Sequence, residues 1–219
     1  MGKIKKLFVH KIFKKFLEII KWTFFVLLGL YIILVIVRIF HFVNLDKTNA
    51  QVKVIHSTKI TMDDVMGVNL PPDPGVNADK TVQGIDANHN GIRDDVELAI
   101  FEKYPNSAKT RAALLQYALA QQMQVTQPFV NNTIATEVLR EDSRADYCLA
   151  NTLAPRDTPE SFRTNDQINK IDKYIFFIKE LQFNTEKRKS TKDLFFKKLK
   201  SYSDLDKELC DFDYSKLEN

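Results

Sequence analysis

The sequence predicts a mainly α protein with an N-terminal transmembrane helix, a polar loop and a small helical bundle. Three observations support this fold class: an uncharged apolar run near the N-terminus, a twelve-residue loop rich in Asp and Asn, and about 120 residues of helical apolar spacing. The predicted parts are a basic amphipathic segment (1–21), a transmembrane anchor (22–43), an extended stalk (44–83) and a helical domain (84–219) with the loop at 86–97.

The segment 1–21 is strongly basic, with seven lysines and one glutamate. Its apolar residues Ile4, Phe8, Ile12 and Phe16 recur at helical spacing, which predicts an amphipathic helix on an anionic inner leaflet. Nucleic-acid binding is the weaker alternative for these lysines, because membrane lipid already accounts for them. The whole chain carries +4 and this segment +6, so the remainder carries −2, which does not fit a basic nucleic-acid binder.

The apolar run 22–43 is long enough to cross a hydrocarbon core of about 30 Å. By the positive-inside rule the lysine-rich side stays in the cytoplasm, and the rest of the chain is exported. This predicts a single-pass protein of a bacterial inner membrane with a periplasmic C-terminal domain. The alternative is a cleaved signal peptide with a poor site at 48–50; the run is longer than a usual signal sequence, which favours an uncleaved anchor.

The segment 44–83 reads as a stalk or linker because it is polar and contains several helix-breaking residues. One short helix is expected in it, capped by Thr61 and ended by Gly67. Pro71, Pro72 and Pro74 then exclude further helix, since each proline biases its predecessor to extended geometry.

The loop 86–97 matches the calcium-binding pattern D-x-[DN]-x-[DN]-G-x5-E throughout. Ca²⁺ prefers six to eight oxygen ligands, and the glycine at position 6 allows the sharp turn between them. The alternative is an Asn/Asp-rich turn that only caps the helix from residue 94. The predicted metal ligands are Asp86, Asn88, Asn90, the backbone carbonyl of Ile92, Asp94 through a water, and Glu97 with both oxygens.

No helix can precede this loop directly, because Pro74, Gly75 and Gly84 lie there. In this respect the loop resembles the EF-hand-like calcium loops of dockerins and thrombospondin type 3 repeats. The longer run 70–97 also resembles a segment of uncharacterised bacterial envelope proteins. The resemblance implies calcium binding and export. With three carboxylates at the ligand positions of the loop, we expect an affinity on the order of 10⁻⁴ to 10⁻³ M, as in extracellular modules.

Five helices are expected after the loop, at about 94–104, 106–127, 132–153, 166–184 and, after a charged joint at 186–190, a last one through 202. Cys148 and Cys210 fall on the exported side, where an isolated pair most often forms a disulfide. Two unpaired buried thiols are the alternative. The aromatic residues of the last two helices are expected to be mostly core, with a remainder that forms a partner surface.

The sequence shows no catalytic signature and no phosphate-binding glycine loop, and His89 is expected to be solvated. We therefore expect a non-enzymatic calcium-binding protein, without an evident small-molecule substrate, that presents a helical surface to another envelope protein. The alternatives are an immunity or inhibitor protein against a periplasmic effector, and an accessory subunit of a membrane complex.

Overall fold

The computed structural model describes residues 2–158, 160–202, 204 and 208–218, with side chains described from residue 13 onward. The predicted apolar face at Ile4, Phe8 and Ile12 therefore lies outside the described side chains. The chain divides into two compact units, Met1–Asn49 and Ala50–Asn219, which are treated separately below. The described residues form helices and loops and no β-strand, which confirms the mainly α class.

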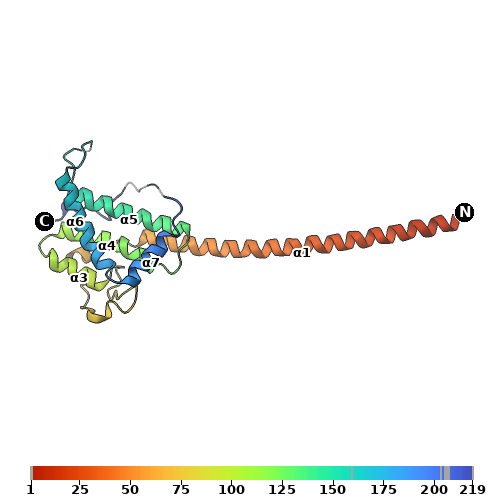
Figure 1. Ribbon diagram of the computed structural model, residues 1–219, viewed down its shortest axis with the longest axis horizontal. Coiled ribbons are helices and arrows are strands. Elements are labelled where there is room, and N and C mark those ends of the chain that lie inside the picture. The colour runs from red at the N-terminus through yellow and green to blue at the C-terminus, as the bar shows by residue number, and fades with distance from the viewer. Residues whose placement is uncertain (1, 159, 203, 205–207, 219) are drawn as a thin grey trace. The chain divides into compact units, whose positions relative to one another are not determined.

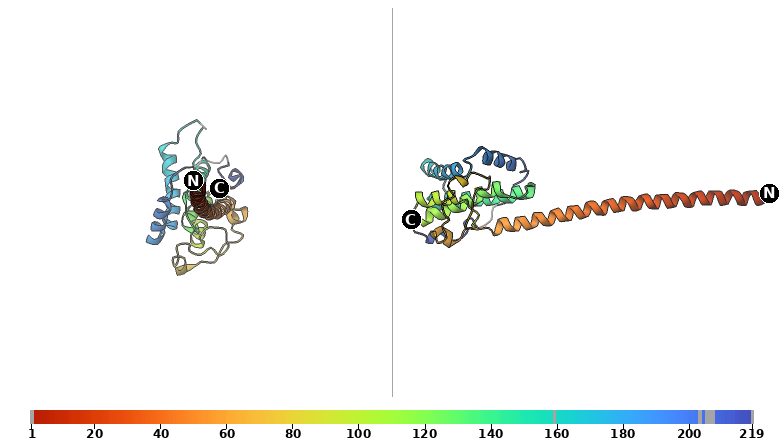
Figure 2. Two further views of the ribbon diagram at one scale, coloured as in Figure 1. Left: turned by 90° about the vertical axis from the view of Figure 1, so that its right-hand side faces the viewer. Right: turned by 90° about the horizontal axis from the view of Figure 1, so that it is seen from below.

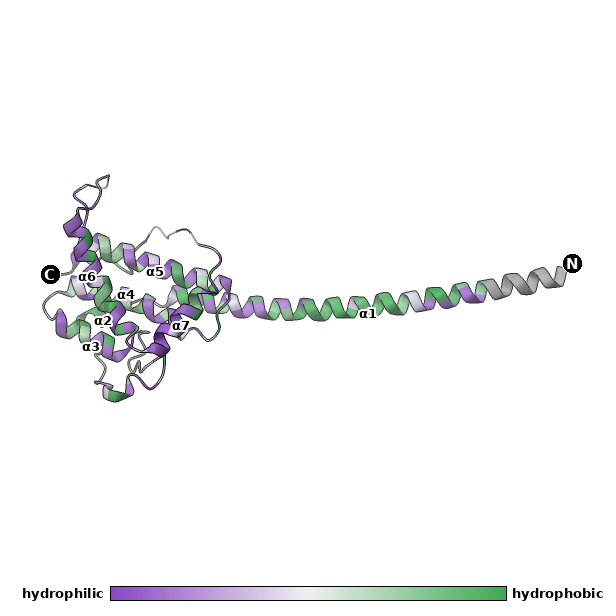
Figure 3. Ribbon diagram, in the orientation of Figure 1, coloured by the Kyte–Doolittle hydropathy of each residue, from purple (hydrophilic) through white to green (hydrophobic). Residues whose placement is uncertain are grey.

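The first unit consists of most of α1 (Gly2–Ser57), a single uninterrupted helix. Its part from Phe13 is long and apolar enough to cross a membrane (Figure 3), and none of its most apolar stretch is buried. An exposed apolar helix of this length near the N-terminus suits a membrane anchor or a signal sequence. Arg38 lies near the end of the apolar stretch, and its guanidinium carbon is 5.0 Å from the ring centroid of Phe42, a cation–π distance.

The second unit is a helical bundle built around α4 (Ala108–Thr126). Seventeen of the 19 residues of α4 are buried, so this helix is covered on every side. Its neighbours are α2 (Met62–Met66), α3 (Asp94–Lys103), α5 (Asn132–Leu153), α6 (Asn165–Gln182) and α7 (Glu186–Phe196) (Figure 1). Helices α6 and α7 lie on one side of the α4–α5 pair (Figure 2).

Side-chain caps fix where these helices begin. Ser107, Asn131 and Thr185 each accept a hydrogen bond from the backbone N–H three residues further on, and Thr164 forms a reciprocal capping box with Gln167. The predicted short helix is also present: Thr61 caps α2 and Gly67 ends it at a φ of 72°. Helix α7 begins at Glu186, so the expected joint at 186–190 is wrong.

Residues 44–83 differ from the expected extended stalk. Helix α1 continues to Ser57, and Ile55, Ile60 and Val65 are buried in the core of the second unit. After α2 the chain runs through a loop with one turn of 3₁₀ helix, η1 (Gly75–Asn77). The prolines do exclude regular helix there, but the polar segment folds onto the bundle instead of leading up to it.

The C-terminal tail closes one end of the bundle. Gln116 of α4 donates to the carbonyl of Leu209 (2.8 Å) and accepts from the hydroxyl of Tyr214 (2.7 Å), and Tyr214 is itself buried. Tyr214 begins a second 3₁₀ turn, η2 (Tyr214–Lys216). Cys148 of α5 forms a disulfide with Cys210, with 5.1 Å between their Cα atoms, and this confirms the predicted pairing.

A half-buried carboxylate on α5 makes the bundle sensitive to pH. Asp142 accepts a hydrogen bond from Gln121 of α4. Burial raises the pKa of Asp142 to about 6; the nearby Asp146 charge adds to this rise and Lys179 and Lys192 oppose it. The folded protein therefore binds this proton more tightly than the unfolded chain, and stability falls as pH rises from about 4 to about 6.

We expect Asp142→Asn to stabilise the protein at neutral pH. An amide has no charge to desolvate, so at pH 7.5 the free energy of unfolding should rise by about 1–3 kcal/mol, and the gain should vanish toward pH 4. Thermal unfolding of both proteins across this range measures the difference. The exposed Asp172→Asn on α6 is the control and should show no such dependence. A gain for Asp142→Asn of equal size at pH 4 and pH 7.5 would contradict the assignment.

Candidate metal centre

The loop before α3 is held in a tight turn by its own side chains. Asp86 accepts hydrogen bonds from the backbone N–H groups of Asn90 (3.2 Å) and Gly91 (2.9 Å), and Asn90 accepts one from the N–H of Ile92 (2.9 Å). Gly91 has a φ of 87°, a conformation that L residues rarely adopt. The predicted glycine position thus has the backbone geometry that the pattern requires.

Three of the predicted ligands meet at one point. The side-chain amides of Asn88 and Asn90 both donate to the same carboxylate oxygen of Glu97, each at 3.1 Å. Glu97 lies in the first turn of α3 and is only 1% exposed. A half-turn of either amide about its terminal bond puts a carbonyl oxygen where the NH₂ group now lies, and in Asn90 this turn also gives up the hydrogen bond from the N–H of Ile92. The same three side chains can then present oxygens to a cation.

Asp94 adds a buried oxygen that lacks a partner. One carboxylate oxygen accepts from the N–H of Ala87 (2.9 Å), whereas the other is buried with no hydrogen bond among the described residues. Such an orphaned acceptor is costly unless a proton, a water or an ion satisfies it. Ile92 between these groups is fully buried, which fixes the backbone whose carbonyl is the predicted ligand at position 7.

The electrostatics of the loop favour a cation. The pKa of Glu97 is raised to about 7, chiefly by burial and also by the charges of Asp64 and Asp94, while the hydrogen bonds from Asn88 and Asn90 oppose the rise. Burial likewise raises the pKa of Asp94, with a contribution from the nearby Asp86 charge. A bound divalent ion would offset the cost of keeping these carboxylates ionised.

The ligand set relies on amides and a carbonyl as well as carboxylates. Within the described chain, no group of three or more His, Cys, Asp or Glu side chains has converged as a metal cluster. The oxygens of Asp86 accept hydrogen bonds from the backbone of the turn. His89 is exposed, and its backbone is left-handed, with a φ of 60°. The donors are hard oxygens, so they fit Ca²⁺ better than a softer transition metal.

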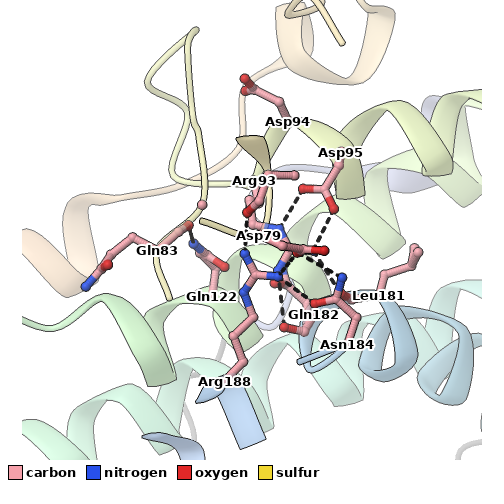
Figure 4. Close-up of polar contacts among 12 residues, drawn as sticks. Asp79, Gln83, Arg93, Asp94, Asp95, Gln122, Leu181, Gln182, Asn184 and Arg188 are labelled. Atoms are coloured by element: carbon pink, nitrogen blue, oxygen red, sulfur yellow. Dashed lines mark hydrogen bonds and ion pairs between the residues drawn. The ribbon is translucent and has the colours of Figure 1, made fainter. Parts of the chain in front are cut away.

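Sequence reasoning missed a buried arginine inside the loop. Arg93 is fully buried and forms two 2.6 Å hydrogen bonds with the carboxylate of Asp95 (Figure 4). It also donates to the carbonyls of Leu181 (2.9 Å) and Gln182 (3.3 Å) at the end of α6. In Figure 4 Asp94 points away from this cluster, toward the loop. Arg93 thus fastens the loop to α6.

A second buried arginine holds the segment before the loop. Arg188 of α7 donates to the carbonyls of Ala78 (2.6 Å), Thr81 (3.2 Å) and Val82 (3.0 Å), and it pairs with Asp79 (Figure 4). This hydrogen bond from Arg188 lowers the pKa of Asp79. Burial, together with the neighbouring Arg93 charge, lowers the pKa of Arg188. No periodicity signals either arginine, because their acceptors come from distant loops.

The two cysteines and His56 are engaged in structural contacts. Both cysteines are in the disulfide, so the described chain has no free thiol. His56 lies between two glutamates of α5, with Nδ1 2.7 Å from Glu141 and Nε2 3.0 Å from Glu137. Both ring nitrogens of His56 are therefore occupied by structural contacts.

Comparison of the chain with protein-family models, curated proteins and solved structures finds no match. The likeness to dockerin and thrombospondin type 3 loops therefore rests on the sequence pattern of residues 84–97. The apolar N-terminal helix fits an anchor or signal, and the disulfide fits an oxidising, extracytoplasmic compartment.

Proposed function

We propose that this chain is a non-enzymatic calcium-binding protein, anchored in a bacterial inner membrane by α1, whose helical domain lies in the periplasm. Its N-terminus would be cytoplasmic, since the lysines precede the apolar stretch. The observation that carries calcium binding is the meeting of Asn88, Asn90 and Glu97 beside the unpartnered buried oxygen of Asp94. The ion would supply the positive charge that this oxygen-lined turn lacks.

Calcium in this proposal is structural. Glu97 and Asp94 belong to the first turn of α3, and Arg93 between the ligands bonds to the end of α6. An ion held here would therefore fix the start of α3 and its distance from α6. The domain ordered in this way would present its helical surface to another envelope protein. Its role would then be binding and not catalysis.

Calcium titration by calorimetry on the full chain in detergent tests the proposal. We expect wild-type protein to bind with a dissociation constant on the order of 10⁻⁴ to 10⁻³ M, and Glu97→Gln to weaken binding at least about tenfold. The matched control is Glu102→Gln, an exposed acid on the same helix, which should bind as wild type does. The proposal is wrong if wild-type protein gives no binding heat, or if Glu97→Gln and Glu102→Gln bind calcium equally well. The loop would then serve only as a cap for α3.

A further inference from the structure

The second unit has a groove between the end of α3 and one face of α6. Its volume is about 560 Å³, within the range of small-ligand and side-chain pockets. Its lining includes Lys103 and Tyr104 from the end of α3, and Lys170, Lys173, Tyr174 and Phe177 from α6.

The floor of the groove is aromatic and fixed in place. The ring of Tyr104 lies 5.9 Å from that of Tyr174 and 6.1 Å from that of Phe177, measured between centroids. All three rings are half-buried and pack against the hydrophobic core. Burial raises the pKa of both tyrosines, so their phenols stay neutral. A rigid, uncharged floor of this kind accepts an aromatic or aliphatic side chain.

The rim of the groove is basic. Lys103, Lys170 and Lys173 are exposed, and Glu180 is the acid that lines the same groove. None of the three lysines pairs with a described carboxylate, although the Lys103 ammonium lies 3.7 Å from the Phe177 ring centroid, a cation–π contact. The rim therefore has a net charge of +2 and exposes ammonium groups that an incoming anion can pair with.

We propose that this groove is a docking site for an acidic peptide segment that carries an aromatic or large aliphatic side chain between carboxylates. The apolar side chain would enter the hollow lined by Tyr104 and Tyr174, and the carboxylates would meet the lysines of the rim. This inference deepens the proposed function, because it names the surface and the chemistry of the envelope partner.

A peptide fits these observations better than a lipid surface. The apolar part of the site is a hollow between two helices with Phe176 as its one large exposed apolar side chain, whereas a membrane-binding face presents many apolar side chains outward across a broad plane. Exposed lysines also come from both elements that line the hollow, so an occupant with its apolar group inside and its acids outside would match them. An extended or helical peptide with such a pattern meets both demands.

The first step of the test is a selection. Full-length protein in nanodiscs of neutral phosphatidylcholine, with calcium present, is panned against a displayed library of random twelve-residue peptides. We expect the enriched peptides to carry Asp or Glu on both sides of an aromatic or large aliphatic residue. A selection that yields no peptide, or yields peptides without acids, overturns the proposal.

The second step is anisotropy of a labelled enriched peptide on protein variants. Lys103→Glu with Lys173→Glu should weaken binding at least about tenfold, because two attractive charges become repulsive. The control reverses two exposed charges, Lys187→Glu in α7 and Lys197→Glu at its C-cap. This variant should bind the peptide within about twofold of wild type. Circular dichroism melting checks that all variants fold.

Two outcomes of this step overturn the proposal: equal affinity for both double variants, or lysine-dependent capture of anionic phosphatidylglycerol vesicles in place of the peptide. The second would make the groove a membrane-binding face. Calcium calorimetry on the same samples is a separate readout, so failure of peptide docking is distinguishable from failure of calcium binding.

Discussion

Arg188→Met is expected to lower the free energy of unfolding by about 2–4 kcal/mol, because a fully buried guanidinium that donates to several backbone carbonyls is removed. Methionine fills much of the space but donates no hydrogen bond. The carbonyls of Ala78, Thr81 and Val82 would then be left without this donor, and Asp79 would lose its pairing cation. Chemical denaturation of the full chain in detergent, monitored by circular dichroism, measures the loss.

The control for this variant is the next residue of the same helix. Lys189 is exposed and pairs with Glu186 at 2.8 Å, and exposed pairs contribute little, so Lys189→Met should unfold like wild type. The free energy of unfolding of Arg188→Lys should lie between those of wild type and Arg188→Met, because lysine keeps the charge and loses the planar set of guanidinium donors. If Arg188→Met lowers the free energy of unfolding no more than Lys189→Met does, the hydrogen bonds of Arg188 do not stabilise residues 78–82.

Gly84→Ala is expected to destabilise the protein by about 2–4 kcal/mol, from backbone strain and overpacking together. Gly84 has a φ of 72°, and a Cβ atom there would lie 2.2 Å from Cδ and 2.5 Å from Cγ of Arg93. The arginine stem is buried and its guanidinium is bonded to Asp95 and Leu181, so it has no free direction in which to move. Denaturant unfolding under the same conditions measures this loss.

Gly75→Ala is a matched control for this effect. Gly75 also has a positive φ, 52°, but a Cβ atom there would meet nothing within 4 Å. Its cost should be the backbone part alone, about 1 kcal/mol. The difference between the two variants reports the collision with Arg93. Equal losses would mean that the loop can shift away from the arginine at little cost.

The elements with local signals were predictable from the sequence. Thr61 and Gly67 bound a short helix because a cap needs only a hydroxyl and a left-handed residue in the right places. The apolar helix, the helical domain and the Cys148–Cys210 disulfide were also predicted, and the structure confirms them. Calcium binding at residues 86–97 stays a prediction, although the ligand side chains do lie around one turn.

The elements that depend on distant partners were not predictable. Residues 44–57 look polar in sequence, yet Ile55 packs into the bundle and His56 lies between two glutamates of α5. Helix α4 buries four glutamines, which weaken its apolar periodicity and hide the fact that it is covered all round. Arg93 and Arg188 are of a residue type that is usually exposed, and only the folded chain brings carbonyl acceptors to them.

In the proposed topology, the tail that closes the bundle determines when the exported domain can finish folding. Gln116 and Arg144, from the middle of the chain, both donate to the carbonyl of Leu209, and Tyr214 fills a buried place beside them. A chain that crosses a membrane from its N-terminal side delivers residues 209–217 long after α4 and α5. If the domain is translocated as proposed, native packing of these two helices waits until residues 209–217 have crossed, and until then this end of α4 and α5 is accessible to chaperones and proteases.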